Sequence, residues 1–451
     1  MTSYASRRAK LMAQMQAMGG GVAIIPTAPE QVRNADSNFP FRFDSNFYYL
    51  TGFTEPESML VLKIGASGSG QAVLFCREKN VELEIWDGFR YGPADACASF
   101  GFDNAHPIGE ADKHMPDLIA DAKHLFYSFS NANIKRPLEL KLQTWCDQLR
   151  ANWRSGLWVP EQAMDVDAML AEMRLFKDAE ESQLMLRAAQ ISSRAHARAM
   201  RATRPGMQEY EIEAELLYEF RKSGAQAPAY TPIVAAGANA CILHYINNNA
   251  TIQDGDIILI DAGCEVDGYA ADITRSYPAN GRFSGPQKEL YELVLASQLA
   301  ALHHAKVGQA YMQGHDAAVR VLAQGMLDLK LLDSNKVGAL EDVIEKKAFR
   351  KFYMHGTGHW LGLDVHDAGQ YRQAPAEAQQ ERAWRPLEAG MVITIEPGLY
   401  VRPSEGVPEQ FWDIGIRIED DILISAEGPQ ILSADAPKTV AEIEYLMQQS
   451  R

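Results

Sequence analysis

Four carboxylates placed at the ends of apolar, branched stretches constrain this chain more than any other feature. Each borders or interrupts a run that is typical of a β-strand: Asp261 after Ile257–Ile260, Asp272 before Ile273–Tyr277, Glu396 after Met391–Ile395, and Glu419 within Ile414–Ile424. A carboxylate in such a place is expected to be buried, which costs several kcal/mol unless it is paired or binds a cation. Arg275 and Arg417 are the only basic residues within three positions of any of the four. The sequence therefore predicts metal cations as the neutralising charges.

A histidine cluster adds a second constraint, in the stretch from His355 to His366 that reads His-Gly-Thr-Gly-His-Trp-Leu-Gly-Leu-Asp-Val-His. Three imidazoles this close together rarely serve packing alone. The interleaved glycines let the backbone approach a ligand that the imidazoles also reach. Imidazoles alone do not make a site for a hard metal or for acid–base chemistry. We therefore expect the cluster and the four carboxylates to form one site.

Composition limits the class of protein. With 451 residues, 47% of them hydrophobic, the chain is long enough for two domains with separate cores. A net charge of −16 argues against nucleic acid or an anionic membrane as the main partner. Five cysteines without Cys-x-x-Cys spacing indicate neither a disulfide framework nor a zinc ribbon. No signal peptide or long uncharged apolar run stands out, so a cytoplasmic protein is the simplest interpretation.

Residues 1–176 are predicted to form an α/β domain. Ser6–Met18 is expected to be a helix and Val22–Ile25 a strand, while Met59–Ile64 and Ala72–Cys76 are expected to pair as a hairpin. The aromatic stretch Phe39–Phe53 is interpreted either as domain core or subunit interface, or as a wall that contacts substrate. No catalytic constellation is predicted in this half.

Residues 177–451 are predicted to form a second domain. Asp178 followed by Glu181 fits a capping box at the start of a long amphipathic helix. The order of two strands and a carboxylate recurs, so two half-domains with two carboxylates each are expected to face each other across one sheet. Other predicted strands are Ile233–Ala236 and Ile273–Tyr277, and other predicted helices are Met207–Lys222, Pro286–Ala305 and Tyr311–Leu329.

The ordered set Asp261, Asp272, His359, Glu396 and Glu419 resembles the metal ligands of the pita-bread metallopeptidases, which include methionine aminopeptidase, prolidase and aminopeptidase P. The first half is similar to the creatinase-type domain that aminopeptidase P and prolidase carry. The motifs most similar to bacterial aminopeptidase P are Arg33-Asn-Ala-Asp-Ser-Asn, Tyr49-Leu-Thr-Gly-Phe-Thr-Glu-Pro-Glu, Ile242-Leu-His-Tyr and His359-Trp-Leu-Gly-Leu-Asp-Val-His-Asp. The resemblance implies an α/β (α+β) fold, with a creatinase-like α/β domain at 1–176 and a pita-bread catalytic domain with pseudo-twofold halves at 177–451.

The resemblance also implies an activity. It is that of a metal-dependent aminopeptidase that releases the N-terminal residue from peptides with proline in the second position, by attack of a water or hydroxide bridging two metals. By the family pattern, Asp261 holds one metal, His359 and Glu396 hold the other, and Asp272 and Glu419 bridge both. Four carboxylates balance two divalent cations, and this oxygen-rich set favours manganese. A homo-oligomer, either a dimer or a tetramer, is expected.

Three further histidines match functional positions of the family. His244 and His366 match residues that contact substrate and stabilise the developing oxyanion. His355 matches an extra histidine of the proline-specific members, suited to proton shuttling or to stabilising the intermediate. Arg417, two residues before Glu419, is predicted to share its strand face and to orient or neutralise a ligand carboxylate. No role is predicted for the histidines of expected helices, which are His196, His303, His304 and His315, and His315 is expected to lie away from the motif.

Two other functions stay open on the sequence. Prolidase would have the same metal site but would hydrolyse only Xaa-Pro dipeptides. A non-catalytic binding protein on the same fold would be metal-replete without peptidase activity on any proline-containing peptide. The length of the accepted peptide separates the first alternative from an aminopeptidase.

Overall fold

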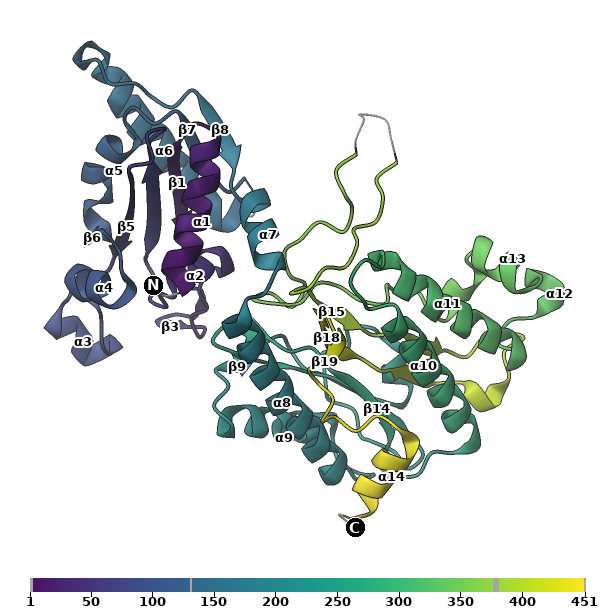
Figure 1. Cartoon of the computed structure of the whole chain (residues 1–451). Coiled ribbons are helices and arrows are strands. Elements are labelled where there is room, and N and C mark those ends of the chain that lie inside the picture. Colours follow the sequence, from purple (N-terminus) through teal and green to yellow (C-terminus); the bar gives the residue numbers. More distant parts are fainter. Residues whose placement is uncertain (1–2, 130–131, 376–380, 450–451) are drawn as a thin grey trace. The chain divides into compact units, whose positions relative to one another are not determined.

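The chain divides into two compact units, Met1–Met173 and Arg174–Arg451 (Figure 1). The structure, a computed structural model, describes residues 3–129, 132–375 and 381–449. The division lies close to the domain change that the sequence places at Phe176. In the described part of the chain, no helix combines the length and the apolar character that crossing a membrane requires.

The first unit is built on a mixed sheet with the strand order β6-β5-β4-β1-β7-β8. Its strands are β1 (Gly21–Pro26), β4 (Met59–Ile64), β5 (Gly70–Cys76), β6 (Asn104–Pro107), β7 (His124–Tyr127) and β8 (Gln162–Asp165). The antiparallel β4 and β5 form the predicted hairpin. The unit also contains the short pair β2 (Val32–Asn34) and β3 (Ser37–Asn38), and the helices α1 (Ser3–Ala17), α2 (Ser45–Thr51), α3 (Val81–Asp87), α4 (Gly92–Phe100), α5 (Ala111–Ile119), α6 (Ala132–Ala151) and α7 (Asp167–Leu175).

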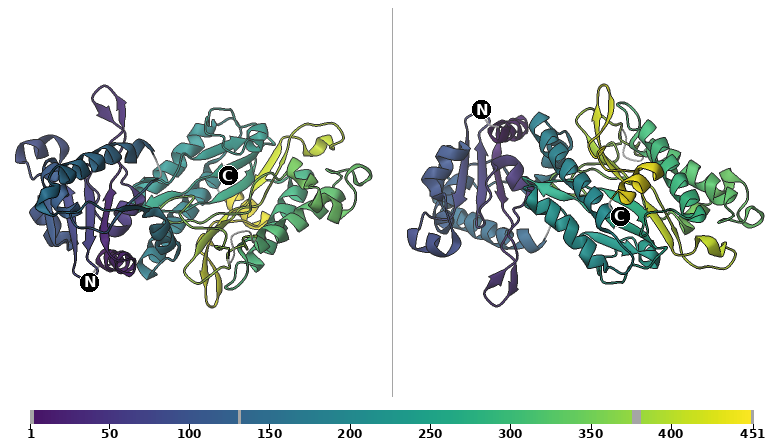
Figure 2. Two further views of the ribbon diagram at one scale, coloured as in Figure 1. Left: turned by 90° about the horizontal axis from the view of Figure 1, so that it is seen from above. Right: turned by 90° about the horizontal axis from the view of Figure 1, so that it is seen from below.

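Helices cover both faces of this sheet, because its central strand is apolar on both sides. Gly21–Ile25 of β1 is buried throughout. Val22 and Ile24 pack with Met115 of α5 and Trp145 of α6 in one core cluster. Figure 2 shows α1, in purple, on the opposite side of the strands. The aromatic residues on α2, from Phe47 to Tyr49, are buried within this unit, as the core interpretation of the aromatic stretch requires.

The second unit contains two strand groups, each flanked by a helix pair. The first half holds β9 (Ala227–Pro228), β10 (Ile233–Ala236), β11 (Ile257–Asp261), β12 (Cys264–Val266), β13 (Tyr269–Ala270) and β14 (Thr274–Pro278). The second half holds β15 (Val392–Ile395), β16 (Gly398–Val401), β17 (Ile414–Arg417), β18 (Asp420–Ser425) and β19 (Gly428–Ile431). The helices are α8 (Ala179–Ala202), α9 (Glu209–Lys222), α10 (Gly285–His303), α11 (Tyr311–Asp328), α12 (Ser334–Val337), α13 (Leu340–Glu345) and α14 (Val440–Gln448). The views place α8 and α9 on one flank of the strands and α10 and α11 on the other (Figures 1 and 2).

The two halves place their carboxylates in corresponding positions. β11 pairs antiparallel with β14, and β15 pairs antiparallel with β18. Asp261 is the last residue of β11 and Glu396 directly follows β15, whereas Asp272 and Glu419 lie just before β14 and β18. The pseudo-twofold arrangement predicted from the strand and carboxylate order is therefore present.

Two predictions about these strands are wrong in detail. The run Ile414–Ile424 is not one strand, because β17 pairs with β16 while β18 pairs with β15. Glu419 lies in the break between them, and its backbone N–H donates to the Thr274 carbonyl at 3.0 Å. Likewise the strands do not form one continuous sheet but separate groups, with the orders β10-β11-β14, β13-β12-β9, β15-β18-β19 and β16-β17 among the described residues.

Local signals set the first long helix of the unit. The Asp178 side chain accepts from the Glu181 N–H at 2.9 Å, and Glu181 accepts from the Asp178 N–H at 2.8 Å. The predicted capping box at the start of α8 is thus confirmed, and it satisfies two of the otherwise unpaired donors of a helix start.

The histidine-rich segment lies alongside β15. The Thr394 N–H donates to the His359 carbonyl at 2.9 Å, and the Glu396 N–H donates to the Thr357 carbonyl at 2.8 Å. A Cβ on Gly358 would lie 2.0 Å from the Thr394 carbonyl oxygen, so only glycine permits this approach. These contacts place His359 next to Glu396.

Candidate metal centre

The predicted site residues meet at one cavity of about 330 Å³ in the second unit. It is lined by Leu243, His244, Asp261, Asp272, His355, Gly356, Gly358, His359, His366, Glu396, Arg417 and Glu419. Both half-domains contribute to this lining. The structure therefore brings together every residue that the sequence analysis singled out for the site.

His359 lies at the centre of the carboxylates. Its Nε2 is 3.4 Å from Oδ2 of Asp272 and 3.6 Å from Oε1 of Glu396. Asp272, His359 and Glu419 offer ligand atoms that all lie within 4.8 Å of one another. The His359 Nδ1–H donates to the Trp360 carbonyl at 2.9 Å, which leaves Nε2 as the ring nitrogen that faces the carboxylates.

The carboxylates crowd one another in a buried place. Burial, reinforced by the charges of Asp272 and Glu396, raises the pKa of Glu419 well above its ordinary value. Burial also raises the pKa of Glu396 to about 7, although His359 and Arg417 oppose the rise. Burial likewise raises the pKa of Asp261. Such a group of negative charges is stable in its ionised form only beside added positive charge.

His359 partly supplies that charge when it is protonated. Burial opposes protonation, but the hydrogen bond and charge of Asp272, with the charge of Glu396, raise the pKa of His359 to about 9. Burial opposes the ionised form of Asp272, but the hydrogen bond and charge of His359, with Tyr230 and Arg417, together lower the pKa of Asp272. One imidazolium and Arg417 cannot balance four carboxylates. The donor set of oxygens with one imidazole therefore fits divalent cations, which would take the place of the His359 proton.

A tyrosine that the sequence did not reveal links two of the carboxylates. The Tyr230 hydroxyl lies 2.5 Å from Oδ1 of Asp261 and 2.5 Å from Oδ1 of Asp272. The Thr274 hydroxyl donates to Oε2 of Glu419 at 2.6 Å. Thr274 follows Asp272 by two residues, so strand alternation was a usable signal for it. Tyr230 lies 31 residues from Asp261 and carries no local signal.

Arg417 contacts the carboxylate of Asp261 and not that of Glu419, its neighbour in the sequence. Its Nη2 donates to Oδ2 of Asp261 at 2.6 Å, its Nη1 to the Tyr400 hydroxyl at 3.0 Å, and its Nε to Thr274 at 3.1 Å. Burial opposes the charge, yet Tyr400 and Asp261 raise the pKa of Arg417 well above its ordinary value. β17 ends at Arg417, before Glu419. The Arg417 side chain contacts Asp261 and so reaches across to the first half-domain.

His355 is held as a neutral ring. Its Nδ1–H donates to the Gly356 carbonyl at 2.7 Å, so its Nε2 accepts from the Tyr400 hydroxyl at 2.8 Å. Burial and the charge of Arg417 lower the pKa of His355 to about 3. Nδ1 also lies 3.7 Å from Oε2 of Glu396. The ring therefore touches the carboxylate group without carrying a charge.

His366 and His244 line the open part of the same cavity. The His366 ring lies 4.1 Å from the His359 ring, centroid to centroid. Burial and the neighbouring His359 lower the pKa of His366. Both side chains are accessible to a molecule that enters the cavity, as contacts to substrate require.

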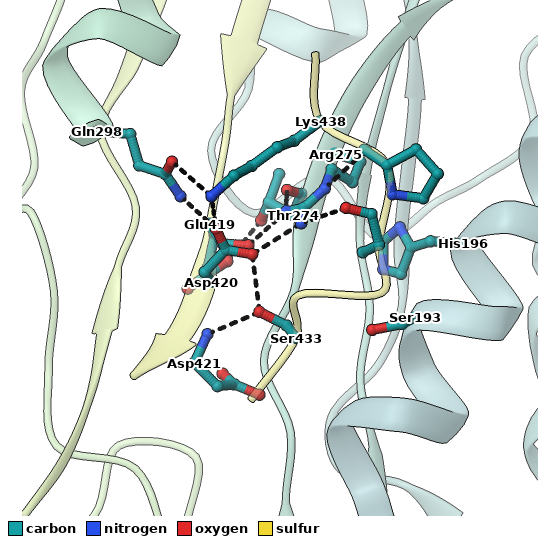
Figure 3. Close-up of polar contacts among 12 residues, drawn as sticks. Ser193, His196, Thr274, Arg275, Gln298, Glu419, Asp420, Asp421, Ser433 and Lys438 are labelled. Carbon is teal, nitrogen blue, oxygen red and sulfur yellow. Dashed lines mark hydrogen bonds and ion pairs between the residues drawn. The ribbon is translucent and has the colours of Figure 1, made fainter. Parts of the chain in front are cut away.

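A buried ionic network contacts the backbone carbonyl of Glu419 (Figure 3). Arg275 donates from Nη1 to the Glu419 carbonyl at 2.6 Å and from Nη2 to Oδ1 of Asp420 at 2.7 Å. Lys438 donates to Oδ2 of Asp420 at 2.6 Å, and Ser433 donates to Oδ1 at 2.7 Å. Burial favours the neutral acid, but Arg275 and Lys438 lower the pKa of Asp420, so the network is ionised.

His315 is not away from the motif, contrary to the sequence prediction. It lies on α11, and its Nδ1 is 2.8 Å from the Thr357 hydroxyl oxygen. The Tyr353 hydroxyl is 2.5 Å from the same oxygen. The prediction is wrong because α11 packs against the histidine segment. This is a tertiary contact that the neighbouring residues in the sequence do not indicate.

Carboxylates from two related half-domains, converging with a histidine on one cavity, define the class as a metallopeptidase. Residues 183–426 match metallopeptidase family M24, and residues 4–127 match the N-terminal domain of aminopeptidase P. The chain belongs to metallopeptidase family M24.

Individual relatives resemble the whole chain. The Xaa-Pro aminopeptidase of Haemophilus influenzae is 41% identical over 444 residues, which cover 98% of this chain and 96% of that protein. The Xaa-Pro aminopeptidase of Escherichia coli is 41% identical over 453 residues, covering 99% of this chain and 98% of that protein. The solved structure of Pseudomonas aeruginosa aminopeptidase PepP matches with a TM-score of 0.94 at 47% identity, covering 99% of this chain and 98% of that chain.

Proposed function

We propose that this chain is a metal-dependent Xaa-Pro aminopeptidase, which releases the N-terminal residue from peptides with proline in the second position. The observation that carries the proposal is the convergence of Asp261, Asp272, His359, Glu396 and Glu419 on the cavity that His244, His355 and His366 also line. The full-length similarity to two Xaa-Pro aminopeptidases supports the substrate class. A structure of an Escherichia coli aminopeptidase P variant has been solved in complex with substrate.

The ligand set follows from the donor atoms. Asp261, Asp272, His359, Glu396 and Glu419 would hold two divalent cations, which, when bound, polarise the scissile carbonyl and acidify an attacking water. Manganese is the proposed ion, because the set is mainly carboxylate oxygen with a single imidazole and no thiolate. Zinc is the alternative that the test must include, since a zinc-substituted structure of Escherichia coli aminopeptidase P has been solved.

The remaining side chains prepare the substrate for attack. His244 and His366 are proposed to contact the peptide and to donate to the oxygen that becomes negative. His355 is neutral and hydrogen-bonded on both nitrogens, so it is suited to receive or return a proton through the Tyr400 hydroxyl during breakdown of the intermediate. Arg417 is proposed to hold Asp261 and Tyr400 in place.

A homo-oligomer is proposed from an apolar surface on the first unit. On α3 the side chains of Val81, Ile85 and Trp86 are 71%, 78% and 84% exposed. An exposed apolar cluster of this kind is typical of a protein–protein contact. A second copy of this chain is the simplest partner, as a dimer or tetramer. A reducing compartment such as the cytoplasm suits the five cysteines, all of which are free thiols.

Peptide hydrolysis tests the proposed function directly. Protein loaded with manganese, and separately with zinc, is incubated with Xaa-Pro-Yaa tripeptides, Xaa-Pro dipeptides and matched Xaa-Ala-Yaa peptides, and the released amino acid is quantified. The proposal expects release from Xaa-Pro-Yaa and little from Xaa-Ala-Yaa. Hydrolysis of the dipeptide alone would identify a prolidase. No hydrolysis of any proline peptide by metal-replete protein would identify a binding protein.

A further inference from the structure

The segment His355–His359 separates two cavities. His355 and His359 line the cavity of the candidate metal centre, whereas Thr357 lines a second cavity of about 420 Å³. Gly356 and Gly358 line both. The segment is therefore a partition only one residue layer thick, with open space on each side. The backbone N–H groups of Glu396 and Thr394 hold its Thr357 and His359 carbonyls along β15, and side chains around the second cavity add further contacts.

Side chains of α10, α11 and β15 enclose the second cavity. Tyr311, His315, His304 and Ile393 are among its lining residues. Its walls are mainly aromatic and aliphatic, so few polar groups are available to fix the partition. The side-chain hydrogen bonds that reach the partition therefore act together with the backbone bonds to β15 in fixing its conformation.

Tyr311, His315 and Tyr353 each contact the partition by a side-chain hydrogen bond, and Oγ1 of Thr394 accepts from the His359 N–H at 3.0 Å. The His315 Nδ1 and the Tyr353 hydroxyl contact the Thr357 hydroxyl oxygen at 2.8 Å and 2.5 Å. The Tyr311 hydroxyl donates to the Gly358 carbonyl. His315 is partly buried, and burial lowers its pKa, so the ring is neutral at physiological pH.

Thr357 connects these contacts to His355. The peptide unit between Gly356 and Thr357 carries the carbonyl that accepts from Nδ1 of His355 at 2.7 Å. This peptide unit can rotate easily at Gly356, because glycine imposes little restriction on its own backbone dihedral angles. If Thr357 moves, the acceptor of the His355 proton moves with it. The ring of His355 then loses one of the two hydrogen bonds that fix its orientation and tautomer, and keeps the contact with Tyr400.

We propose that His315 is a positioning residue of the candidate active site: through Thr357 it fixes the Gly356 carbonyl and thereby the orientation and tautomer of the His355 imidazole. This inference rests on the proposed function only for the role of His355 in peptide hydrolysis. The structural part concerns the residues of this chain alone. His315 does not line the cavity of the metal centre and acts only through its neighbours.

The kinetic test compares His315 with a matched histidine. His304 lines the same second cavity, but its side chain makes no hydrogen bond to the partition within the part of the chain that the structure describes. Manganese-loaded His315→Ala, His315→Asn and His304→Ala proteins are assayed on an Xaa-Pro-Yaa peptide. We expect His315→Ala to lower kcat on the order of ten- to hundredfold, as loss of a supporting partner does. KM, bound metal and the unfolding midpoint should stay close to those of His304→Ala.

Partial rescue separates a hydrogen bond from simple packing. The amide of His315→Asn places a polar atom near the former Nδ1 and should restore most of kcat, and added imidazole should restore part of it in His315→Ala by entering the cavity. In a Thr357→Val background, His315→Ala should cause no further loss. Equal loss in His304→Ala and His315→Ala, or His315→Asn as slow as His315→Ala, would overturn the proposal.

A spectroscopic readout makes the inference independent of activity. In metal-free protein labelled with nitrogen-15 on histidine, the His355 signals should show a single tautomer with the proton on Nδ1. His315→Ala should give averaged tautomers at His355, and His304→Ala should not. Unchanged His355 signals in His315→Ala would refute the positioning role. If wild-type protein hydrolyses no peptide, the proposed function fails while this readout still decides the inference.

Discussion

Nη2 of Arg417 lies 2.6 Å from Oδ2 of Asp261, a carboxylate 156 positions earlier in the chain. The contact joins the last residue of β17 to the last residue of β11, and so links one half-domain to the other. Arg417 also donates to Tyr400 and Thr274, which touch His355 and Glu419. One guanidinium therefore aligns groups on both sides of the candidate metal centre.

Arg417→Lys should weaken metal binding although it keeps the positive charge. A single ammonium cannot serve three acceptors in the planar geometry that the guanidinium provides. We expect the affinity for manganese to fall about tenfold to a hundredfold. Competition with a chromophoric chelator measures it, and Arg282→Lys, at an exposed arginine, is the control. Unchanged affinity for manganese would show that the contact between Arg417 and Asp261 does not contribute to metal binding.

Removal of the metal should abolish hydrolysis of Xaa-Pro-Yaa peptides. Chelation leaves the crowded carboxylates without the cations that the proposed mechanism needs, and manganese should restore turnover. The assay measures activity against bound metal in dialysed protein. Full activity in metal-free protein would contradict the proposed function.

Glu396→Ala should lose metal and activity together. The variant removes one proposed ligand next to His359, while the other carboxylates stay. Metal content by atomic emission and turnover are measured on the same sample. Glu388→Ala, an exposed carboxylate in the segment before β15, is the matched control. A Glu396→Ala protein with normal metal content would require another ligand assignment.

His366→Ala should lower kcat and leave the metal in place. If His366 donates to the developing oxyanion, its loss removes about 3 to 4 kcal/mol of stabilisation made mainly in the transition state, roughly a hundred- to thousandfold in rate. His303→Ala, at an exposed histidine of α10, serves as the control. Loss of metal in His366→Ala would instead make His366 a ligand.

Asp367→Asn should lower stability in a pH-dependent way. Asp367 lies 2.9 Å from Nζ of Lys177 and 2.5 Å from Arg174, all buried. Burial opposes ionisation, but Lys177 and Arg174 hold the pKa of Asp367 below its ordinary value. A carboxyl group whose pKa is lowered by folding stabilises the folded state. This stability is fully present above the pKa of the unfolded state, about 3.9, and is lost as pH falls through the pKa of the folded state.

The variant should therefore be less stable by about 3 to 5 kcal/mol at neutral pH, because buried Lys177 loses its carboxylate partner and Arg174 loses one of the carboxylates that it contacts. Denaturant unfolding of both proteins between neutral and acidic pH measures the difference. It should stay constant down to about pH 4 and shrink below it. A difference that grows on acidification would contradict the ionised pair.

The carboxylates could be predicted because their signals are local. Apolar runs ending at Asp261 and Glu396 mark strand ends, and the histidine segment supplies the remaining ligand type. The capping box of α8 was predictable for the same reason, since Asp178 and Glu181 are three residues apart. The hydrophobic periodicity and the capping residues of an element all lie within that element or next to it, so the sequence alone reveals them.

The contacts that support the ligands could not be predicted in this way. Tyr230 and His315 reach the site from loops and helices that sequence spacing does not connect to it. The break between β17 and β18 was also hidden, because the residues from Ile414 to Ile424 are apolar enough for one strand. The break arises where the chain changes its pairing partner, which is a property of the assembled half-domains.

The buried network of Arg275, Asp420 and Lys438 sets an order of events during synthesis. Arg275 contacts both the Glu419 carbonyl and the Asp420 side chain, and Asp420 is fully paired only when Lys438 has also folded into place. The network is therefore complete only when the chain as far as Lys438 has left the ribosome. A chain stalled before Lys438 would leave Asp420 without its ammonium partner and the structure next to Glu419 unfinished.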